Sequence, residues 1–243
     1  MSVVLTDCKI FLGGYDLSGH HNQLELNYAA EMLDDTVFGT SGTRSSKPGL
    51  KTVEYSGTIF WDESIDGPIF NRIGATREVL SCAHVGNAVG DPAYTVRAVQ
   101  GTYNPLSGEV GQLLAATLDG HSANSPLVRG AVLIPRNPAM TVTGTGTVWQ
   151  LGAVAAGKRV YGALHVIHAA GSGPPAISVT VKSAAALGFG SPTNRLTFAP
   201  QSVPGAQWME TNGSAITDQY WRADWTISGT GPNFRAFLVV GIL

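Results

Sequence analysis

Histidines and neighbouring acids are the residues of this sequence that could bind a metal ion or transfer protons. His165 and His168 lie three positions apart in the run HVIH. The run has the composition of a strand, and residues three apart on a strand point to opposite faces, so these rings are not expected to share a metal ion. His20 and His21 lie near Asp16 in a polar turn, where we expect solvated side chains.

The paired acids are equally poor candidates for catalysis. Asp34-Asp35 and Asp62-Glu63 are adjacent in loop-like segments, whereas catalytic carboxylates are held at a fixed spacing across a cleft. The sequence also contains no nucleophile elbow, no HExxH zinc motif, no phosphate-binding loop and no dinucleotide fingerprint. We therefore expect a protein that is not an enzyme, with no catalytic residues, no metal site and no cofactor.

Aromatic residues near the C-terminus allow two interpretations. Trp208 and Tyr220 could form a flat platform on which a sugar ring stacks, or they could pack into a core. Trp221 and Trp225 alternate with polar residues, as the inward face of a strand does, so we expect both to be core anchors. Each would bury about 150–250 Å².

The elements that would position such residues begin with residues 22–62. Residues 24–28 and 53–61 alternate between apolar and polar side chains, which predicts two half-buried strands. A polar insert from about residue 31 to residue 51 separates them and is far longer than a usual hairpin loop. A short helix is expected over residues 67–73, with Asp66 as its N-cap and with Ile69, Phe70 and Ile73 on its apolar face.

Composition favours an all-β protein that covers much of its surface in an assembly. Of the 243 residues, 44% are hydrophobic and only 13% are charged, with 30 glycines. Residues 1–138 hold 9 Lys+Arg and 14 Asp+Glu, a net −5, whereas residues 139–243 hold 6 and 3, a net +3. This asymmetry, with a Gly-, Thr- and Pro-rich linker over 137–147, predicts two domains, 1–138 and 139–243. The second domain shows about seven short strand candidates, typical of an antiparallel sandwich.

The N-terminus lacks the charged and apolar regions of a signal peptide, and no apolar run is long enough to form a membrane-spanning helix. We expect synthesis in a cytoplasm and no membrane anchor.

The first half resembles the major tail tube proteins of long-tailed, siphovirus-type bacteriophages. The resemblance covers roughly residues 3–135 and is carried by YDLSG, NQLELNYAAEMLDDTVFG, GLKTVEYSGTIFWD and DGPIFNRIG. It implies an N-terminal β-sandwich or barrel with one short helix and a long inter-strand loop. The second half is similar, more weakly, to the immunoglobulin-like or lectin-like sandwiches that some tail proteins carry outside.

The resemblance also implies a function. Subunits of this family form rings, usually hexameric, which stack into a tube that conducts DNA during ejection, and the long loop contacts the neighbouring ring. Here the loop residues would be Asp34, Asp35, Phe38, Arg44, Lys47 and Leu50, with Arg44 and Lys47 pairing with acids of the next subunit. Deleting residues 39–47 would then abolish polymerisation without unfolding the subunit.

The partners implied are copies of the chain and other tail proteins, within a virion tail assembled in the bacterial host cytoplasm. DNA would pass without specific binding, and an acidic first domain suits a channel wall that does not retain phosphate. A tail protein that binds carbohydrate or a receptor through the C-terminal sandwich is the alternative. Tube, terminator and baseplate rings are not distinguished by the sequence.

Overall fold

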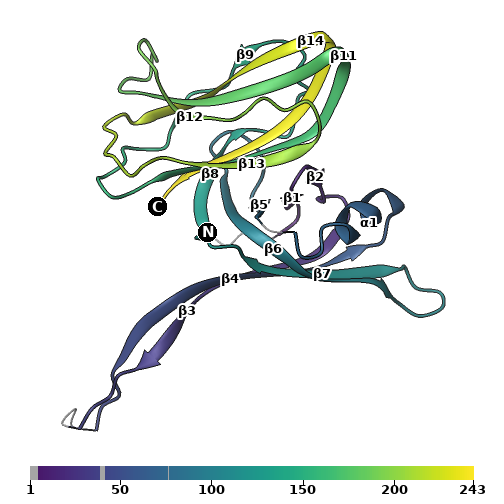
Figure 1. The fold of residues 1–243 in the computed structure, drawn as a ribbon, viewed down its shortest axis with the longest axis vertical. Helices are drawn as coiled ribbons and strands as arrows, with labels where there is room; N and C mark the ends of the chain where they lie inside the picture. The colour runs from purple at the N-terminus through teal and green to yellow at the C-terminus, as the bar shows by residue number, and fades with distance from the viewer. Residues whose placement is uncertain (1–4, 39–41, 76) are drawn as a thin grey trace. The chain divides into compact units, whose positions relative to one another are not determined.

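The computed structural model describes residues 5–38, 42–75 and 77–243 and consists almost entirely of β-strands (Figure 1). The predicted all-β class, with one short helix, is confirmed. Contacts group the chain into two compact units: residues 1–19, 78–95 and 128–243 form unit 1, and residues 20–77 and 96–127 form unit 2. The contacts thus group β8 and the N-terminal strands with the C-terminal strands, and the division at residues 138/139 stays a prediction about folding domains.

The strands of unit 1 come from three parts of the chain. They are β1 (Lys9–Leu12), β2 (Tyr15–Asp16), β5 (Glu78–Ala83), the start of β6 (Pro92–Ser107), β8 (Val128–Ile134), β9 (Gly144–Thr145), β10 (Trp149–Gln150), β11 (Val160–Ala184), β12 (Thr193–Thr197), β13 (Gly205–Glu210) and β14 (Tyr220–Ile242). Unit 2 contains β3 (His21–Asp34), β4 (Ser46–Phe60), the helix α1 (Glu63–Phe70), the rest of β6, and β7 (Ala115–Ser122).

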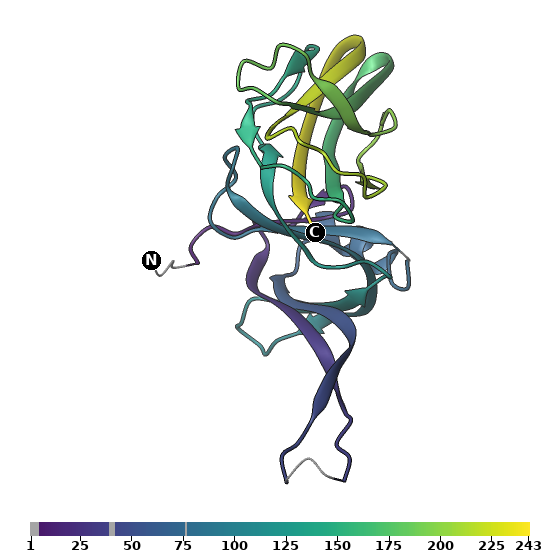
Figure 2. The same cartoon turned by 90° about the vertical axis from the view of Figure 1, so that its left-hand side faces the viewer.

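Two long strands, β11 and β14, build the sandwich of unit 1. They pair from Val160↔Ile242 to Ala184↔Tyr220, and both bend midway, where the register shifts and Gly171 and Gly229 have positive φ (Figures 1 and 2). The first half of β11 pairs with β13 and the second half with β12, so each long strand contributes to both layers. One apolar cluster, including Trp221, fills the space between them. The sequence predicts four separate strands here because glycine-rich bends look like breaks.

A second apolar cluster lies on the other side of one layer of unit 1. It joins Phe11 of β1 and Ala83 of β5 to Val132, Phe237 and Val239. The rings of Phe11 and Phe237 stack with their centroids 4.1 Å apart. The N-terminal strands are therefore bound to the C-terminal sandwich by core packing within unit 1.

In unit 2, β4 pairs with β3 on one side and with β7 on the other, and β7 pairs with β6. One face of this sheet is buried and includes Tyr55, Ile59 and Leu118, as period-two alternation requires. Tyr103 of β6 donates a hydrogen bond to Asp66 of α1 over 2.7 Å, which fixes the helix to the sheet.

The helix differs from its prediction. It spans Glu63–Phe70, and its N-cap is Asp62, whose carboxylate accepts from the Ser64 N–H at 2.8 Å, rather than Asp66. Its buried residues are Ile65 and Ile69, whereas Phe70 is exposed. Among the described residues, no helix is long and apolar enough to cross a membrane.

Candidate assembly interface

The two strands that flank the predicted loop form a long ribbon. β3 and β4 pair from His21↔Ile59 to Asp34↔Ser46, so the insert is mostly strand and only residues 35–45 connect the two. Pro48 lies opposite Met32, next to a register shift, which is where a strand tolerates proline. β7 pairs with β4 only from residue 54 to residue 60, so among the described strands residues 28–34 and 46–53 pair with each other alone. The described residues of this far part, 28–38 and 42–53, are called the ribbon here.

The ribbon leaves apolar side chains uncovered. Tyr28, Met32, Leu33, Val37, Phe38 and Leu50 are all exposed, Met32 to 64% and Leu50 to 78%. Every residue of β3 beyond Leu26 is exposed, on both faces of the strand. Among the described strands, β3 pairs with β4 alone, so its outer edge presents free N–H and C=O groups. Exposed apolar side chains beside an unpaired strand edge are features that surfaces for another polypeptide commonly share.

Charged residues at the end of the ribbon pair with each other across the hairpin. Lys47 Nζ lies 3.0 Å from Asp35 Oδ2, and Arg44 Nε lies 3.6 Å from Asp34 Oδ2. Hydrogen bonds from Thr36 lower the pKa of Asp34, and hydrogen bonds led by that from Ser45 lower the pKa of Asp35. The structure thus gives Arg44 and Lys47 partners in their own hairpin, and their pairing with a neighbouring subunit stays a prediction.

The polar face of unit 2 carries acidic side chains on neighbouring strands. Glu25 lies opposite Ser56, which lies opposite Asp119, and Asn27 lies opposite Glu54. His121 Nδ1 lies 3.7 Å from Glu54 Oε1. These side chains line a shallow depression of about 460 Å³, which no Lys or Arg lines.

A second exposed apolar segment lies at the connection between β6 and β7. This 106–114 loop contains Leu106, Val110 and Leu113, which are 75%, 107% and 73% exposed. Figure 1 shows the loop at the opposite side of unit 2 from the ribbon.

Trp208 and Tyr220, the residues of the predicted aromatic platform, lie on β13 and β14. Trp208 lies opposite Ala163 of β11, its ring centroid 5.7 Å from that of Tyr161. Tyr220 lies opposite Ala184, at the C-terminal end of β11. Glycan binding by the sandwich stays a prediction.

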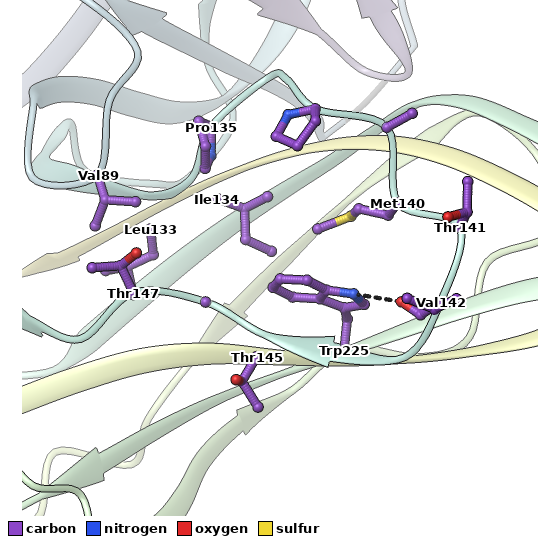
Figure 3. Close-up of a pocket in the computed structure, with 13 residues that line it drawn as sticks. Val89, Leu133, Ile134, Pro135, Met140, Thr141, Val142, Thr145, Thr147 and Trp225 are labelled. Atoms are coloured by element: carbon purple, nitrogen blue, oxygen red, sulfur yellow. Dashed lines mark hydrogen bonds between the residues drawn. The ribbon is translucent and has the colours of Figure 1, made fainter.

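Trp221 and Trp225, both predicted as core anchors, differ in how deeply they are buried. Trp221 is fully buried and donates from Nε1 to the Gly152 carbonyl at 2.9 Å, which makes it a core anchor as predicted. Trp225 packs only partly into the core and lines a pocket of about 280 Å³, called the Trp225 pocket here (Figure 3). The pocket's walls come from Val89, from residues 133–147 and from β14. Within the described part of the chain, no group of three His, Cys, Asp or Glu residues could hold a metal ion.

No protein-family model and no curated protein matches the chain. Solved structures that are similar to the chain include the following three. A chain of the native gene transfer agent virion is 14% identical with a TM-score of 0.44, covering 52% of this chain and 97% of its own. A chain of the sheath/tube terminator of the PVC extracellular contractile injection system is 8% identical with a TM-score of 0.42, covering 52% and 96%.

The Dit (gp 19.1) protein of SPP1, described as a hub of the adsorption apparatus in phages that infect Gram-positive bacteria, matches over most of both chains. It is 12% identical with a TM-score of 0.38, covering 98% of this chain and 100% of its own. The neighbours are thus components of virions, tail hubs and injection systems.

Proposed function

We propose that this chain is a structural subunit of a phage-type tail, which assembles with copies of itself through the β3–β4 ribbon. The observation that carries the proposal is that the ribbon extends beyond the sheet with apolar side chains exposed on it. A two-stranded ribbon is barely stable alone in water, and uncovered apolar surface favours burial against a partner. The free edge of β3 adds backbone donors and acceptors that a further strand can use.

The partner proposed is another copy of the chain. The resemblance of residues 3–135 to tail tube proteins supports rings, of six copies as in that family, which stack with the ribbon end between them. Assemblies of this kind bury 2,000 Å² or more in each interface, on the order of obligate complexes. An obligate interface also accounts for a chain in which only 13% of residues are charged.

The polar face of unit 2 is proposed as the wall of the channel. Glu25, Glu54 and Asp119 would face the passing DNA, with no Lys or Arg lining the depression beside them. A wall of this sign repels phosphate and releases no counterions on contact, so DNA slides past without being retained.

The first test shortens the ribbon without disturbing its register. Residues 39–47, the deletion predicted from the sequence, include Ser46 and Lys47, which pair with Asp34 and Leu33. Replacing residues 36–44 with Asn-Gly keeps these pairs and closes the hairpin with a two-residue turn. We expect a folded subunit that forms no rings or tubes in electron microscopy and sedimentation.

A milder variant tests the apolar contact itself. Substituting Met32 and Leu50 with Thr should weaken association by about tenfold or more, since burying each side chain is worth about 1.5–3 kcal/mol. Leu187→Thr is the matched control, because Leu187 is 63% exposed but belongs to unit 1. Normal tubes from both ribbon variants, or a wild type that stays monomeric at high concentration, would contradict the proposal.

A further inference from the structure

The Trp225 pocket is preformed by hydrogen bonds that tie its walls to β14. Trp225 Nε1 donates to the Val142 carbonyl at 3.0 Å, as Figure 3 shows, and the Ile227 N–H donates to Thr143 Oγ1 at 2.9 Å. Met140 and Phe234 exchange two backbone hydrogen bonds of 2.7 and 2.9 Å. A cavity framed in this way keeps its shape when empty, so an occupant loses little free energy to ordering it.

The lining of the pocket restricts the chemistry of its occupant. Most of its lining side chains are apolar, and no charged residue lines it. A charged group would lose its hydration there without gaining a partner. Hydroxyl groups are supplied only by the exposed Thr141, Thr145 and Thr147, too few and too peripheral to satisfy the many hydroxyls of a sugar. The pocket therefore suits an uncharged aliphatic or aromatic side chain.

Among the described residues, apolar side chains are exposed in several places, and two groups of them lie at the ends of paired strands, on the ribbon and on the 106–114 loop. The charges of these two groups differ. Phe38 at the ribbon end is surrounded in sequence by Asp34, Asp35, Arg44 and Lys47, whose hydration would be lost on entry. The 106–114 loop contains a single charged residue, Glu109. An uncharged socket is better matched by this loop than by the ribbon end.

The loop also has a fixed apex. The Gln112 N–H donates to the Glu109 carbonyl at 3.0 Å, and Gly111 has a φ of +90°, which closes a tight turn. Val110 lies within that turn and is fully exposed, with Leu106 and Leu113 beside it in the loop. A rigid protrusion with an apolar apex loses little conformational entropy on docking.

We propose that the Trp225 pocket of one copy receives Val110 from the 106–114 loop of a second copy. The inference rests on the proposed self-assembly and names a contact distinct from the ribbon. Loop and pocket are different surfaces, so the contact is heterologous and continues from copy to copy until a ring closes. Each subunit would be held by a loop-to-pocket contact on one side and by a pocket-to-loop contact on the other.

A disulfide trap tests this contact in the full-length protein. Val110→Cys and Thr145→Cys are combined in a Cys8→Ser background, since Cys8 is half-buried and Cys82 is buried. Both new positions are exposed, so neither change threatens folding. Mild oxidation should yield a covalent ladder of dimers and higher species on a non-reducing gel, because a disulfide forms only when the two Cα atoms come within about 7 Å. The control pair, Val203→Cys with Thr145→Cys, should yield no ladder.

Association is measured in parallel with Val110→Asp, which should weaken it at least tenfold, and with Val203→Asp, which should leave it unchanged because Val203 is 65% exposed and lies outside the loop, the pocket and the ribbon. If the protein assembles but the cysteine pair gives no covalent ladder and Val110→Asp has no effect on association, the loop-to-pocket contact is overturned. The ribbon proposal is not affected by that outcome. The absence of any assembly in the wild type overturns the proposed function itself, and this contact with it.

Discussion

His165 on β11 hydrogen-bonds through Nδ1 to the carbonyl of Gly13, 152 residues earlier in the chain, at 2.8 Å. A carbonyl only accepts, so Nδ1 carries the proton, and Nε2 accepts from the Ser81 hydroxyl, also at 2.8 Å. The ring is fully buried. Burial lowers the pKa of His165 to about 4, although the bond to Gly13 acts in the opposite direction. The neutral imidazole thus connects β11 to β5 and to the turn that follows β1.

This burial predicts an acid-sensitive free energy of unfolding. The unfolded chain binds a proton at His165 near pH 6.5, whereas the folded chain resists protonation until about pH 4. Stability is therefore complete above pH 6.5 and falls as the pH drops toward 4, by about 3 kcal/mol in all. Urea denaturation at a series of pH values measures this slope.

The variant His165→Phe distinguishes the contribution of His165 to this pH dependence from that of the carboxylates, which titrate at lower pH. Its free energy of unfolding at pH 7 should be lower by about 1–3 kcal/mol, because the Gly13 carbonyl loses its donor. The difference between wild type and variant should shrink as the pH falls from 6.5 to 4. A constant difference across that window would show that His165 does not titrate as stated.

Two glycines should respond in opposite directions to a single methyl group. A Cβ at Gly120 would lie 2.4 Å from the Val99 carbonyl oxygen and 2.4 Å from the Tyr55 ring, whereas a Cβ at Gly19 meets nothing within 4 Å beyond its chain neighbours, and the φ of Gly19 is not positive. Gly120→Ala should destabilise the protein by about 1–3 kcal/mol through overpacking. Gly19→Ala should stabilise it by about 0.4–1 kcal/mol, since alanine lowers the conformational entropy of the unfolded chain. Melting temperatures that shift in the same direction for both variants would contradict this prediction.

Alternation of side chains was enough to predict strands and the all-β class, but it did not define where these elements end. The helix was predicted over residues 67–73 from a cap and an apolar face, whereas it spans Glu63–Phe70. Asp62 and Asp66 are both suitable N-caps by residue type, and the choice depends on the packing of Ile65 against the sheet. The register shift opposite Ala30 and Met32 hides the continuation of β3, because a bulge breaks strict alternation.

The sites were less predictable than the strands. The ribbon was predicted as a contact element from residues 34–50, yet the in-hairpin ion pairs depend on register, which the sequence does not reveal. The Trp225 pocket brings together Val89, Met140 and Trp225, which are far apart in sequence and share no motif. A threonine at position 143 gives no indication of a site from its residue type. Only the hydrogen bond that its hydroxyl accepts from the Ile227 N–H shows that the 137–147 segment is bound to β14.

Reversing the charge of the polar face should convert a repelling surface into one that retains DNA. The double variant Glu25→Lys with Asp119→Lys replaces two negative charges with two positive ones and so raises the net charge of the proposed channel wall by four per subunit. We expect assemblies that bind DNA with an affinity that falls steeply with salt, whereas the wild type shows no such binding. The matched control, Asp7→Lys with Glu210→Lys, changes the net charge equally at exposed sites of unit 1. Equal DNA binding by both variants would mean that net charge, rather than this face, determines retention.

Exchanging the charges of Asp35 and Lys47 distinguishes pairing within the hairpin from pairing between subunits. The variant Asp35→Lys with Lys47→Asp keeps an opposite pair across the strands, where the wild-type atoms lie 3.0 Å apart. If the pair acts only within its hairpin, association should stay within about threefold of wild type, since an exposed ion pair is worth about 0–1 kcal/mol. If Lys47 instead binds an acid of the next subunit, the exchange places two acids together and association falls much further. Lys47→Asp alone leaves both hairpin positions negative and is the reference variant. Sedimentation of the wild type, the double variant and Lys47→Asp at one ionic strength measures their association.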